Sequence, residues 1–287
     1  MNKAGSSGPD NALAIELAHL KKISLYRRRH LVDGPVQPET IIDGNRVLAF
    51  CSNDYLGLAN DERLVSAARN GLDTYGLGAG SAHLVAGHTR EHDKLEQELA
   101  EFTGRARALL FSTGYMANIG IASALLERGD AVFEDRWNHA SLLDAGILSG
   151  AKFSRFRHAD TSELSEKLSR ANARRVLVMT DGVFSMDGDM APLPALVKAC
   201  EKNDAWLCVD DAHGIGVLGR GGRGSCEYYD LCAEDVPILM GTLGKAFGSF
   251  GAFVAGSETV IETLIQKARS YIYTTAPPPA VTVATRA

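Results

Sequence analysis

Short, fully apolar segments recur along the chain after residue 105, and segments with helical spacing separate them. The apolar segments are Ala108–Phe111, Ala131–Phe133, Val176–Met179, Trp206–Val209, Ile238–Met240 and Ala252–Ala255. Segments that are apolar throughout suit strands buried on both faces, and parallel neighbours require crossover helices between them. The pattern therefore predicts an α/β fold with a mainly parallel sheet.

The chain before residue 105 has a different organisation. Apolar positions at helical spacing predict a helix over 12–29 that ends in Arg27, Arg28 and Arg29. A short strand is expected from Arg46, and helices are expected near 61–73 and over 92–102, on either side of a glycine-rich stretch at 76–87. We expect an N-terminal helix and strand segment over 1–50, a large α/β domain over 51–275, and the start of a further domain over 276–287.

Almost every predicted strand of the large domain ends in polar residues. Examples are Ser112–Tyr115, Glu134–Asp135, Thr180–Asp181, Asp210–His213 and Gly241–Lys245. Open α/β sheets bind ligands at the carboxyl ends of their strands, so these ends should converge on one site. This arrangement predicts an enzyme.

Composition narrows the class of protein. The 287 residues carry 30 Lys and Arg against 35 Asp and Glu, a net charge of −5, which excludes a strongly basic nucleic-acid binder. The five cysteines are odd in number and form no CxxC pair, so we expect a reducing, cytoplasmic compartment and no structural metal. No signal peptide or apolar stretch of spanning length is recognisable, which predicts no membrane partner.

Two nucleotide-binding motifs are weighed and set aside. Gly214–Gly219 matches G-x-G-x-x-G, but it continues into Arg220–Gly224, which cannot sustain the helix that a dinucleotide fingerprint needs. Gly244–Lys245 lacks the Ser or Thr of a P-loop, because Ala246 follows the lysine. What remains is one lysine among small residues at a strand end.

Three residues together point to a pyridoxal cofactor. Such a cofactor needs a lysine for its aldehyde and a carboxylate that keeps its ring nitrogen protonated, roles that suit Lys245 and Asp210 with His213 nearby. The alternative for Asp210 and His213 is a helix-capping carboxylate beside a hydrogen-bonded histidine. Ser112–Asn118 offers a helix N-terminus for a phosphate, or only an N-cap. His139 is suited to stacking on an aromatic ring, or is a structural histidine.

In order along the chain, six motifs resemble those of the α-oxoamine synthases, a family of fold-type-I pyridoxal-phosphate enzymes related to the class-II aminotransferases. The motifs are Ser52–Leu58, Phe111–Asn118, Asp135–Leu142, Gly182–Asp189, Val209–Gly214 and Gly241–Gly248. The resemblance implies a fold-type-I transferase with a mainly parallel seven-stranded sheet. It also implies that this chain stops where the family continues into a small C-terminal domain, which makes activity of these residues alone doubtful.

The resemblance assigns roles residue by residue. It implies that Lys245 bonds to the aldehyde of pyridoxal 5′-phosphate, Asp210 pairs with the ring nitrogen, His213 contacts the phenolic oxygen, and His139 stacks on the ring and meets substrate. Implied further contacts are Gly114, Tyr115 and Thr242 at the phosphate, Ser185 near the ring, Arg27 and Asn53 at the substrate, and Thr274 and Thr275 at a neighbouring subunit's phosphate. The last pair implies a homodimer with shared sites.

Within the family, Gly78–Gly87 is most similar to the biotin-pathway branch, and glycine-using relatives usually carry Arg near His83. That branch condenses L-alanine with pimeloyl-CoA or pimeloyl-ACP to give 8-amino-7-oxononanoate, CO2 and free thiol. Two alternatives stay open: a glycine-using synthase resembling 2-amino-3-oxobutyrate CoA ligase, and a non-catalytic partner subunit. For Arg28 and Arg29, attraction of an acidic substrate and a solvated helix end are equally compatible with the sequence.

Overall fold

The computed structural model describes residues 8–287 and divides into two compact units between Phe50 and Cys51. The first unit contains helix α1 (Pro9–Lys22) and the strands β1 (Val32–Asp33), β2 (Glu39–Ile42) and β3 (Asn45–Leu48). The strands form a three-stranded antiparallel sheet in the order β1-β2-β3. Asp43 and Gly44 turn β2 into β3 with positive φ angles of 51° and 77°, as a tight hairpin requires.

The N-terminal helix is confirmed, but the prediction of its end was wrong. It ends at Lys22, and Ser24 follows in the left-handed region with a φ of 59°. Arg27, Arg28 and Arg29 therefore lie in exposed coil, beyond the helix. They do not form a helix end, so that reading of Arg28 and Arg29 is excluded.

The second unit begins with α2 (Glu62–Tyr75), a short π-helix η1 (His83–Gly87) and α3 (Arg90–Thr103), so both helices expected in this region are confirmed. Strands and helices then alternate. They are β4 (Arg107–Phe111), α4 (Gly114–Leu125), β5 (Ala131–Asp135), α5 (Ala140–Leu148), β6 (Lys152–Phe156), α6 (Thr161–Ser169), β7 (Val176–Asp181), α7 (Leu193–Lys202) and β8 (Trp206–Asp210), followed by α8 (Ser225–Tyr228), β9 (Ile238–Thr242), β10 (Ala252–Gly256), α9 (Glu258–Lys267), α10 (Arg269–Ile272) and α11 (Pro279–Arg286).

The seven-stranded, mainly parallel sheet predicted from the sequence is confirmed, with the strand order β4-β10-β9-β8-β7-β5-β6. All six apolar segments are strands of this sheet. β10 is the exception to the parallel arrangement, since it pairs antiparallel with both β4 and β9. The seventh strand, β6, was not found from the pattern, because it pairs on one side only and is largely polar.

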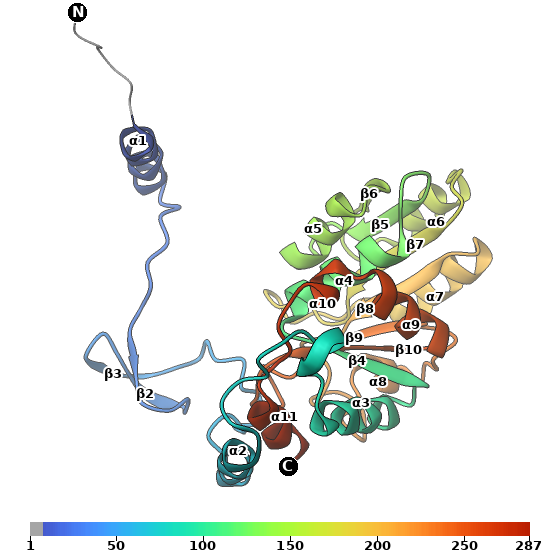
Figure 1. The fold of residues 1–287 in the computed structure, drawn as a ribbon. Helices are drawn as coiled ribbons and strands as arrows, with labels where there is room; N and C mark the ends of the chain where they lie inside the picture. The colour runs from blue at the N-terminus through green and yellow to red at the C-terminus, as the bar shows by residue number, and fades with distance from the viewer. Residues whose placement is uncertain (1–7) are drawn as a thin grey trace, which may run out of the picture. The chain divides into compact units, whose positions relative to one another are not determined.

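Helices cover both faces of this sheet (Figure 1). Alternate strand residues pack on opposite sides, as the period of a strand requires. Leu110, Val178 and Leu207 join a core with α3, α6 and α7. Leu109, Leu177 and Cys208 join a second core with α4, α5, α9 and α10. The result is a helix–sheet–helix sandwich whose central strands are buried on both faces.

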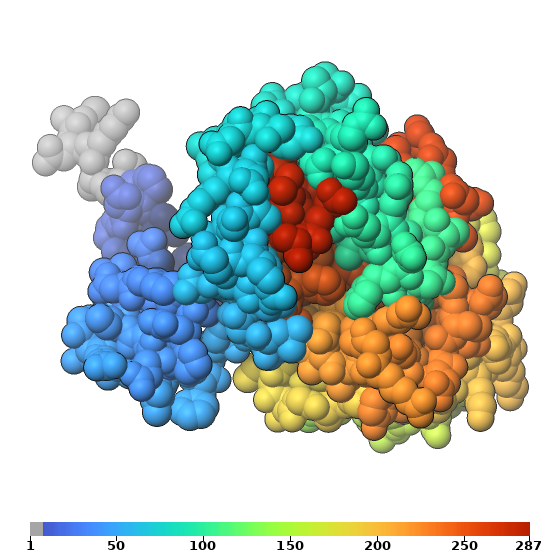
Figure 2. Space-filling model, turned by 90° about the horizontal axis from the view of Figure 1, so that it is seen from below, coloured from blue at the N-terminus to red at the C-terminus, as the bar shows by residue number. Residues whose placement is uncertain are grey.

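Helix α11 packs beside α2 and α3 (Figure 2). Gly71 of α2 permits this contact, because a Cβ there would lie 2.7 Å from Cα of Ala280. Nε2 of His92 lies 2.9 Å from the carbonyl oxygen of Pro277, which stands two residues before the start of α11. Over residues 8–287, none of the helices combines the length and apolar character needed to span a bilayer.

Candidate active site

The carboxyl ends of three parallel strands meet at one small cavity. β7, β8 and β9 run in the same direction and end at Asp181, Asp210 and Thr242. These three residues line a cavity of about 180 Å³, to which the segment after β5 adds His139. Its lining residues are Gly114, Tyr115, His139, Ser141, Asp181, Asp210, Ala212, His213, Met240, Thr242 and Lys245. The convergence expected at the carboxyl ends of the strands is present.

Lys245 and His213 meet inside this cavity. Lys245 lies in the loop between β9 and β10, and its Nζ is 2.7 Å from Nε2 of His213. Burial lowers the pKa of Lys245, although Asp210 and Asp181 oppose the shift. Burial, together with the charges of Lys245 and His139, lowers the pKa of His213 to about 4. The imidazole is therefore neutral near pH 7, and the amine is more readily deprotonated than an exposed lysine.

Asp210 is held rigidly at the end of β8. Only 3% of it is exposed, and its two oxygens accept hydrogen bonds from Nδ2 of Asn118, at 2.8 Å, and from the amide of Ala212, at 3.0 Å. Burial raises the pKa of this carboxyl above its usual value. A cationic N–H group beside Asp210 would compensate the buried charge, and a protonated pyridine ring is such a group.

A second buried carboxylate, Asp181, stands at the end of β7. Its Oδ2 accepts the backbone N–H of His139 at 2.7 Å. Burial and the proximity of Asp210 both raise the pKa of Asp181. Nδ1 of His139 lies 2.7 Å from the hydroxyl of Ser141, which also accepts a hydrogen bond from Asn118 at 2.8 Å. One network thus orients the histidine and Asp210 together.

The N-terminus of α4 offers unpaired donors at the same cavity. Thr113 caps the helix, and its side chain accepts the amide of Met116. The amides of Gly114 and Tyr115 precede the first intrahelical bond, so they are free to bind an anion. A Cβ on Gly114 would lie 3.3 Å from Cε of Met240, a tight contact that a small shift of the methionine side chain would relieve. A phosphate therefore fits here, and the lysine, carboxylate and phosphate seat together match pyridoxal phosphate.

The sequence analysis named more residues than the cavity contains. Gly114, Tyr115, His139, Asp210, His213, Thr242 and Lys245 line it. Ser185, Thr274 and Thr275 do not: Ser185 is exposed in the loop after β7, and Thr275 forms an isolated bridge with Ala82. Arg27 is exposed in the first unit. Asn53 is exposed, and its side chain accepts a hydrogen bond from Tyr55.

The capping alternative for Asp210 is wrong, because turns rather than a helix follow β8. Asp211 is the carboxylate that meets a helix, since its Oδ2 accepts the amide of Ser225 at 2.7 Å. Residues 214–219 likewise contain no helix, so the dinucleotide reading stays excluded.

Four residues that bond to side chains lining the cavity, or line it themselves, were given no role from the sequence: Tyr55, Asn118, Ser141 and Asp181. Tyr55, Asn118 and Ser141 stand inside motifs that the sequence analysis quoted, and Asp181 ends a predicted strand. These positions were the available signals. The contacts of Tyr55 and Asn118 join residues 158 and 92 positions apart, which no local pattern reveals.

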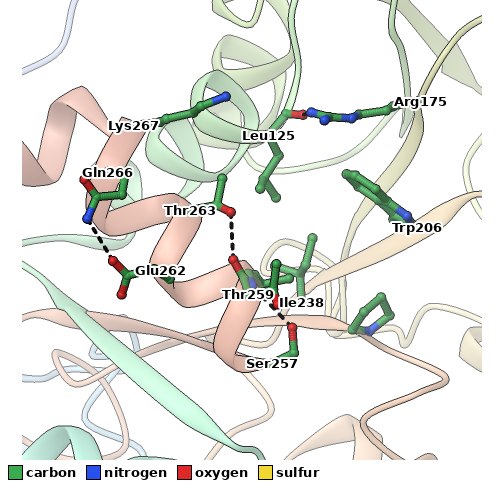
Figure 3. A pocket seen from close by; sticks show the side chains of 12 residues that line it. Leu125, Arg175, Trp206, Ile238, Ser257, Thr259, Glu262, Thr263, Gln266 and Lys267 are labelled. Carbon is green, nitrogen blue, oxygen red and sulfur yellow. Dashed lines mark hydrogen bonds between the residues drawn. The ribbon is translucent and has the colours of Figure 1, made fainter.

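A larger cavity of about 670 Å³ lies at the amino ends of β8 and β9, at the opposite end of these strands from the small cavity (Figure 3). Trp206 and Ile238, the first residues of β8 and β9, line it. Two of its polar side chains bond to neighbouring lining residues: Arg175 donates to the carbonyl of Leu125, and Gln266 donates to Glu262. Its lining residues do not include a lysine, carboxylate and histidine set like Lys245, Asp210 and His213, so the smaller cavity is the candidate active site.

Comparison with known proteins agrees with this geometry. The sequence profile "Aminotransferase class I and II" matches residues 45–287. An 8-amino-7-oxononanoate synthase from Cellvibrio japonicus is 60% identical over 97% of this chain and 70% of its own length. One from Thioalkalivibrio sulfidiphilus is 60% identical over 96% of this chain and 70% of its own length.

Solved structures show the same similarity. A serine palmitoyltransferase from S. paucimobilis with a bound PLP–myriocin aldimine has a TM-score of 0.89 at 31% identity, covering 98% of this chain and 71% of that one. An 8-amino-7-oxononanoate synthase from Francisella tularensis has a TM-score of 0.71 at 39% identity, covering 83% of this chain and 66% of that one. On the profile match and these identities, the chain belongs to the aminotransferase class I and II family.

Proposed function

We propose that this chain is a pyridoxal-phosphate-dependent acyltransferase that condenses L-alanine with pimeloyl-CoA or pimeloyl-ACP. The products are 8-amino-7-oxononanoate, CO2 and the free thiol, a step of biotin synthesis. One observation carries the proposal: Nζ of Lys245 lies in a cavity with the buried carboxylate of Asp210 and the neutral ring of His213. The names of the relatives that are 60% identical support the choice of substrates.

Pyridoxal phosphate supplies an electrophilic aldehyde and a ring that withdraws electrons from the α-carbon of a bound amino acid. Asp210 is the residue that would keep the ring nitrogen protonated. Its burial makes the ionised carboxylate costly unless a cation faces it, so Asp210 and a ring N–H stabilise each other. Asn118 and Ala212 hold the carboxylate in place through their hydrogen bonds.

Lys245 is the residue that would bind the aldehyde and afterwards move a proton at the α-carbon of the amino acid. Its lowered pKa favours the neutral amine that either task requires. Nε2 of His213 shares a hydrogen bond with Nζ, and on the family resemblance His213 would contact the phenolic oxygen of the bound cofactor. The free amides of Gly114 and Tyr115, with Thr242, would hold the phosphate.

Of the residues that we assign to substrate recognition, His139 lines the cavity. His139 is exposed there and is fixed by Asp181 and Ser141, which suits it to stack on the cofactor and to meet the acyl substrate. We assign Asn53 to the amino-acid carboxylate and Ser185 to the ring side. Arg27 is assigned to the acidic acyl chain on the family resemblance alone.

We also propose a homodimer in which Thr275 of one chain reaches the phosphate site of the other. Thr275 does not line the cavity of its own chain. Around the bridge that it forms with Ala82, three large apolar side chains are exposed: Leu84 (52%), Val85 (80%) and Tyr273 (71%). Such an apolar patch is typical of a protein interface.

The visible absorption spectrum with added pyridoxal phosphate tests the function. We expect a band that requires Lys245 and that responds to L-alanine at lower concentration than to glycine. Lys245→Ala should abolish the band, and Lys198→Ala, at an exposed lysine on α7, should leave it unchanged. A preference for glycine would identify a glycine-using synthase. If no band that depends on Lys245 is seen, the result would favour a non-catalytic partner subunit.

A further inference from the structure

His158, which the sequence analysis did not single out, has a carboxylate at each ring nitrogen. Its Nδ1 lies 3.1 Å from Oδ1 of Asp135, and its Nε2 lies 2.8 Å from Oδ2 of Asp189. The side chain of His158 is only 18% exposed, and that of Asp135 is 2% exposed. His158 therefore joins two acidic residues that stand 54 positions apart, from Asp135 to Asp189.

The chemistry of this bridge fixes the charge of His158. An ionised carboxylate can only accept hydrogen bonds, so both ring nitrogens must carry a proton. Burial lowers the pKa of His158, but the hydrogen bonds and charges of Asp135 and Asp189 outweigh it, and the net shift is upward. Arg157 pairs with Asp160 and Glu163 instead, so the two aspartates are the charges that face the ring.

Two aromatic side chains enclose the imidazolium. The ring of Trp137 stacks on it at a centroid distance of 4.1 Å and an interplanar angle of 16°. The ring of Phe184 meets it edge to face at 4.5 Å and 86°. An aromatic face attracts a cation, so the stacked Trp137 favours the charged ring.

On one side, the bridge holds the turn that leads to His139. Asp135 accepts the backbone amides of Trp137, at 2.9 Å, and Ala159, at 2.7 Å. Its own carbonyl accepts the amide of Asn138 at 3.2 Å. The next residue is His139, whose backbone amide bonds Asp181 in the candidate active site.

On the other side, the bridge holds the loop after β7 that carries Ser185. Within this loop, the amide of Phe184 donates to the carbonyl of Asp189, and the amide of Gly188 donates to the carbonyl of Phe184, both at 2.9 Å. The tip is exposed, as the 91% exposed Met186 shows. His158 is the side chain that ties this closed loop to the end of β5.

We propose that His158 is a positioning residue, an imidazolium that fixes the Ser185 loop and the His139 turn relative to each other beside the cofactor ring. The proposal rests on the proposed function, in which Ser185 lies on the ring side and His139 stacks on the ring. Loss of the bridge should therefore weaken binding of the cofactor.

His158→Phe tests this role, because it keeps a flat ring against Trp137 and removes both hydrogen bonds. We expect hydrogen exchange at the amides of Phe184 and Gly188 to accelerate about tenfold or more. The concentration of pyridoxal phosphate that half-saturates the spectral band should rise about tenfold. His30→Phe is the matched control, because His30 pairs with Asp43 in the first unit. It should change none of these values.

A measurement without cofactor keeps this inference separate from the proposed function. The ¹⁵N shifts of the His158 ring should show both nitrogens protonated at pH 7, and Asp189→Asn, which can still accept the hydrogen bond, should lower the pKa of His158. A neutral ring at pH 7, or unchanged exchange at Phe184 in His158→Phe, would overturn the proposal. If His158→Phe does not fold, the Asp189→Asn titration decides alone. Failure of the proposed function would appear instead as an absent Lys245-dependent band.

Discussion

The hydroxyl of Tyr55 lies 2.6 Å from Nδ1 of His213, on the side of the ring opposite Lys245. The same hydroxyl lies 3.3 Å from Oδ1 of Asn53, so a continuous hydrogen-bonded line runs from the Ser52–Leu58 motif to the lysine. The neutral ring of His213 carries one N–H proton and has two hydrogen-bond partners, Tyr55 and Lys245. Which partner donates to the ring, and which accepts from it, decides which ring nitrogen carries the proton. Because the hydroxyl can accept from Nδ1 when that nitrogen carries the proton and donate to it when it does not, we expect Tyr55 to control which nitrogen of His213 is available to Lys245.

Tyr55→Phe should weaken this control without unfolding the protein, because the side chain is 42% exposed. We expect the pKa of Lys245 and the turnover of L-alanine to change, with turnover falling about threefold to tenfold, as the loss of one neutral hydrogen bond suggests. Tyr228→Phe, at a tyrosine that is 55% exposed, is the control. Equal rates for Tyr55→Phe and wild type would show that the hydroxyl is dispensable.

Asp210→Asn should lose turnover by about a hundredfold or more, since a neutral amide cannot keep a ring nitrogen protonated. Steady-state kinetics with L-alanine and a pimeloyl thioester measure the effect. Asp73→Asn, at an exposed position of α2, serves as the control. Near-wild-type turnover of Asp210→Asn would contradict the role given to this carboxylate.

Asp181→Asn should stabilise the cofactor-free protein at alkaline pH. Burial and Asp210 raise the pKa of Asp181 from 3.8 to about 8. The unfolded chain therefore releases this proton at lower pH than the folded chain, so stability falls as pH rises from 3.8 to about 8 and stays lowered above that range. The variant avoids this cost and still accepts the amide of His139. We expect its advantage in urea unfolding to grow by about 1 kcal/mol or more between pH 5 and pH 9. A constant difference across that range would argue against the shift.

His83 predicts that the stability of the folded protein falls as the pH decreases, the opposite of the dependence predicted for Asp181. It is 6% exposed, and burial together with the charges of His88 and His92 lowers its pKa from 6.5 to about 3. Between pH 6.5 and about 3, His83 binds a proton in the unfolded chain but not in the folded one, so stability falls as pH drops below 6.5. His83→Phe removes this term and keeps a ring stacked on Tyr271.

The unfolding free energy of wild type minus that of His83→Phe should therefore decrease by about 2 kcal/mol from pH 6.5 to pH 5. The subtraction removes the contributions of the buried carboxyls, which both proteins share. A difference that does not vary with pH would mean that His83 is charged in the folded protein.

Gly248→Ala should displace the lysine loop. Gly248 has a φ of +62°, and a Cβ there would lie 2.4 Å from the carbonyl carbon of Leu58. Gly104→Ala is the matched control, with a φ of +66° and open space around the Cβ, so it measures backbone strain alone. We expect Gly104→Ala to cost about 1 kcal/mol and Gly248→Ala to cost clearly more and to weaken cofactor binding. Equal costs and equal cofactor affinities would contradict the close approach.

The strands of the large unit were predictable because the central ones are buried on both faces and therefore read as apolar throughout. β6 escaped this test, since an edge strand such as Lys152–Phe156 has only one neighbour and tolerates Lys, Ser and Arg. The first sheet was largely missed for a similar reason: most residues of β1, β2 and β3 are exposed.

The candidate site was predictable where chemistry and position along the chain coincide. Lys245 and Asp210 come at the ends of apolar segments, so their position at the carboxyl ends of the strands could be inferred from the sequence. Tyr55 and His158 could not, because their roles arise from tertiary contacts. Each is an ordinary polar residue in its own segment and acquires a function only from His213 in one case and from Asp135 and Asp189 in the other.

The position of β10 has a consequence for how the protein folds. β4 is an edge strand of the seven-stranded sheet, and its neighbour is β10, where Ala252 pairs with Phe111. The strand that leads into α4 can therefore join the sheet only after β10, which lies about 140 residues later in the chain, is in place. Contacts of such high sequence separation form slowly, since a long loop must close first. The free amides of α4 and the amine of Lys245 are brought together by that same closure. Cofactor capture would therefore mark the completion of the sheet during refolding and would favour the finished chain over its partly folded intermediates.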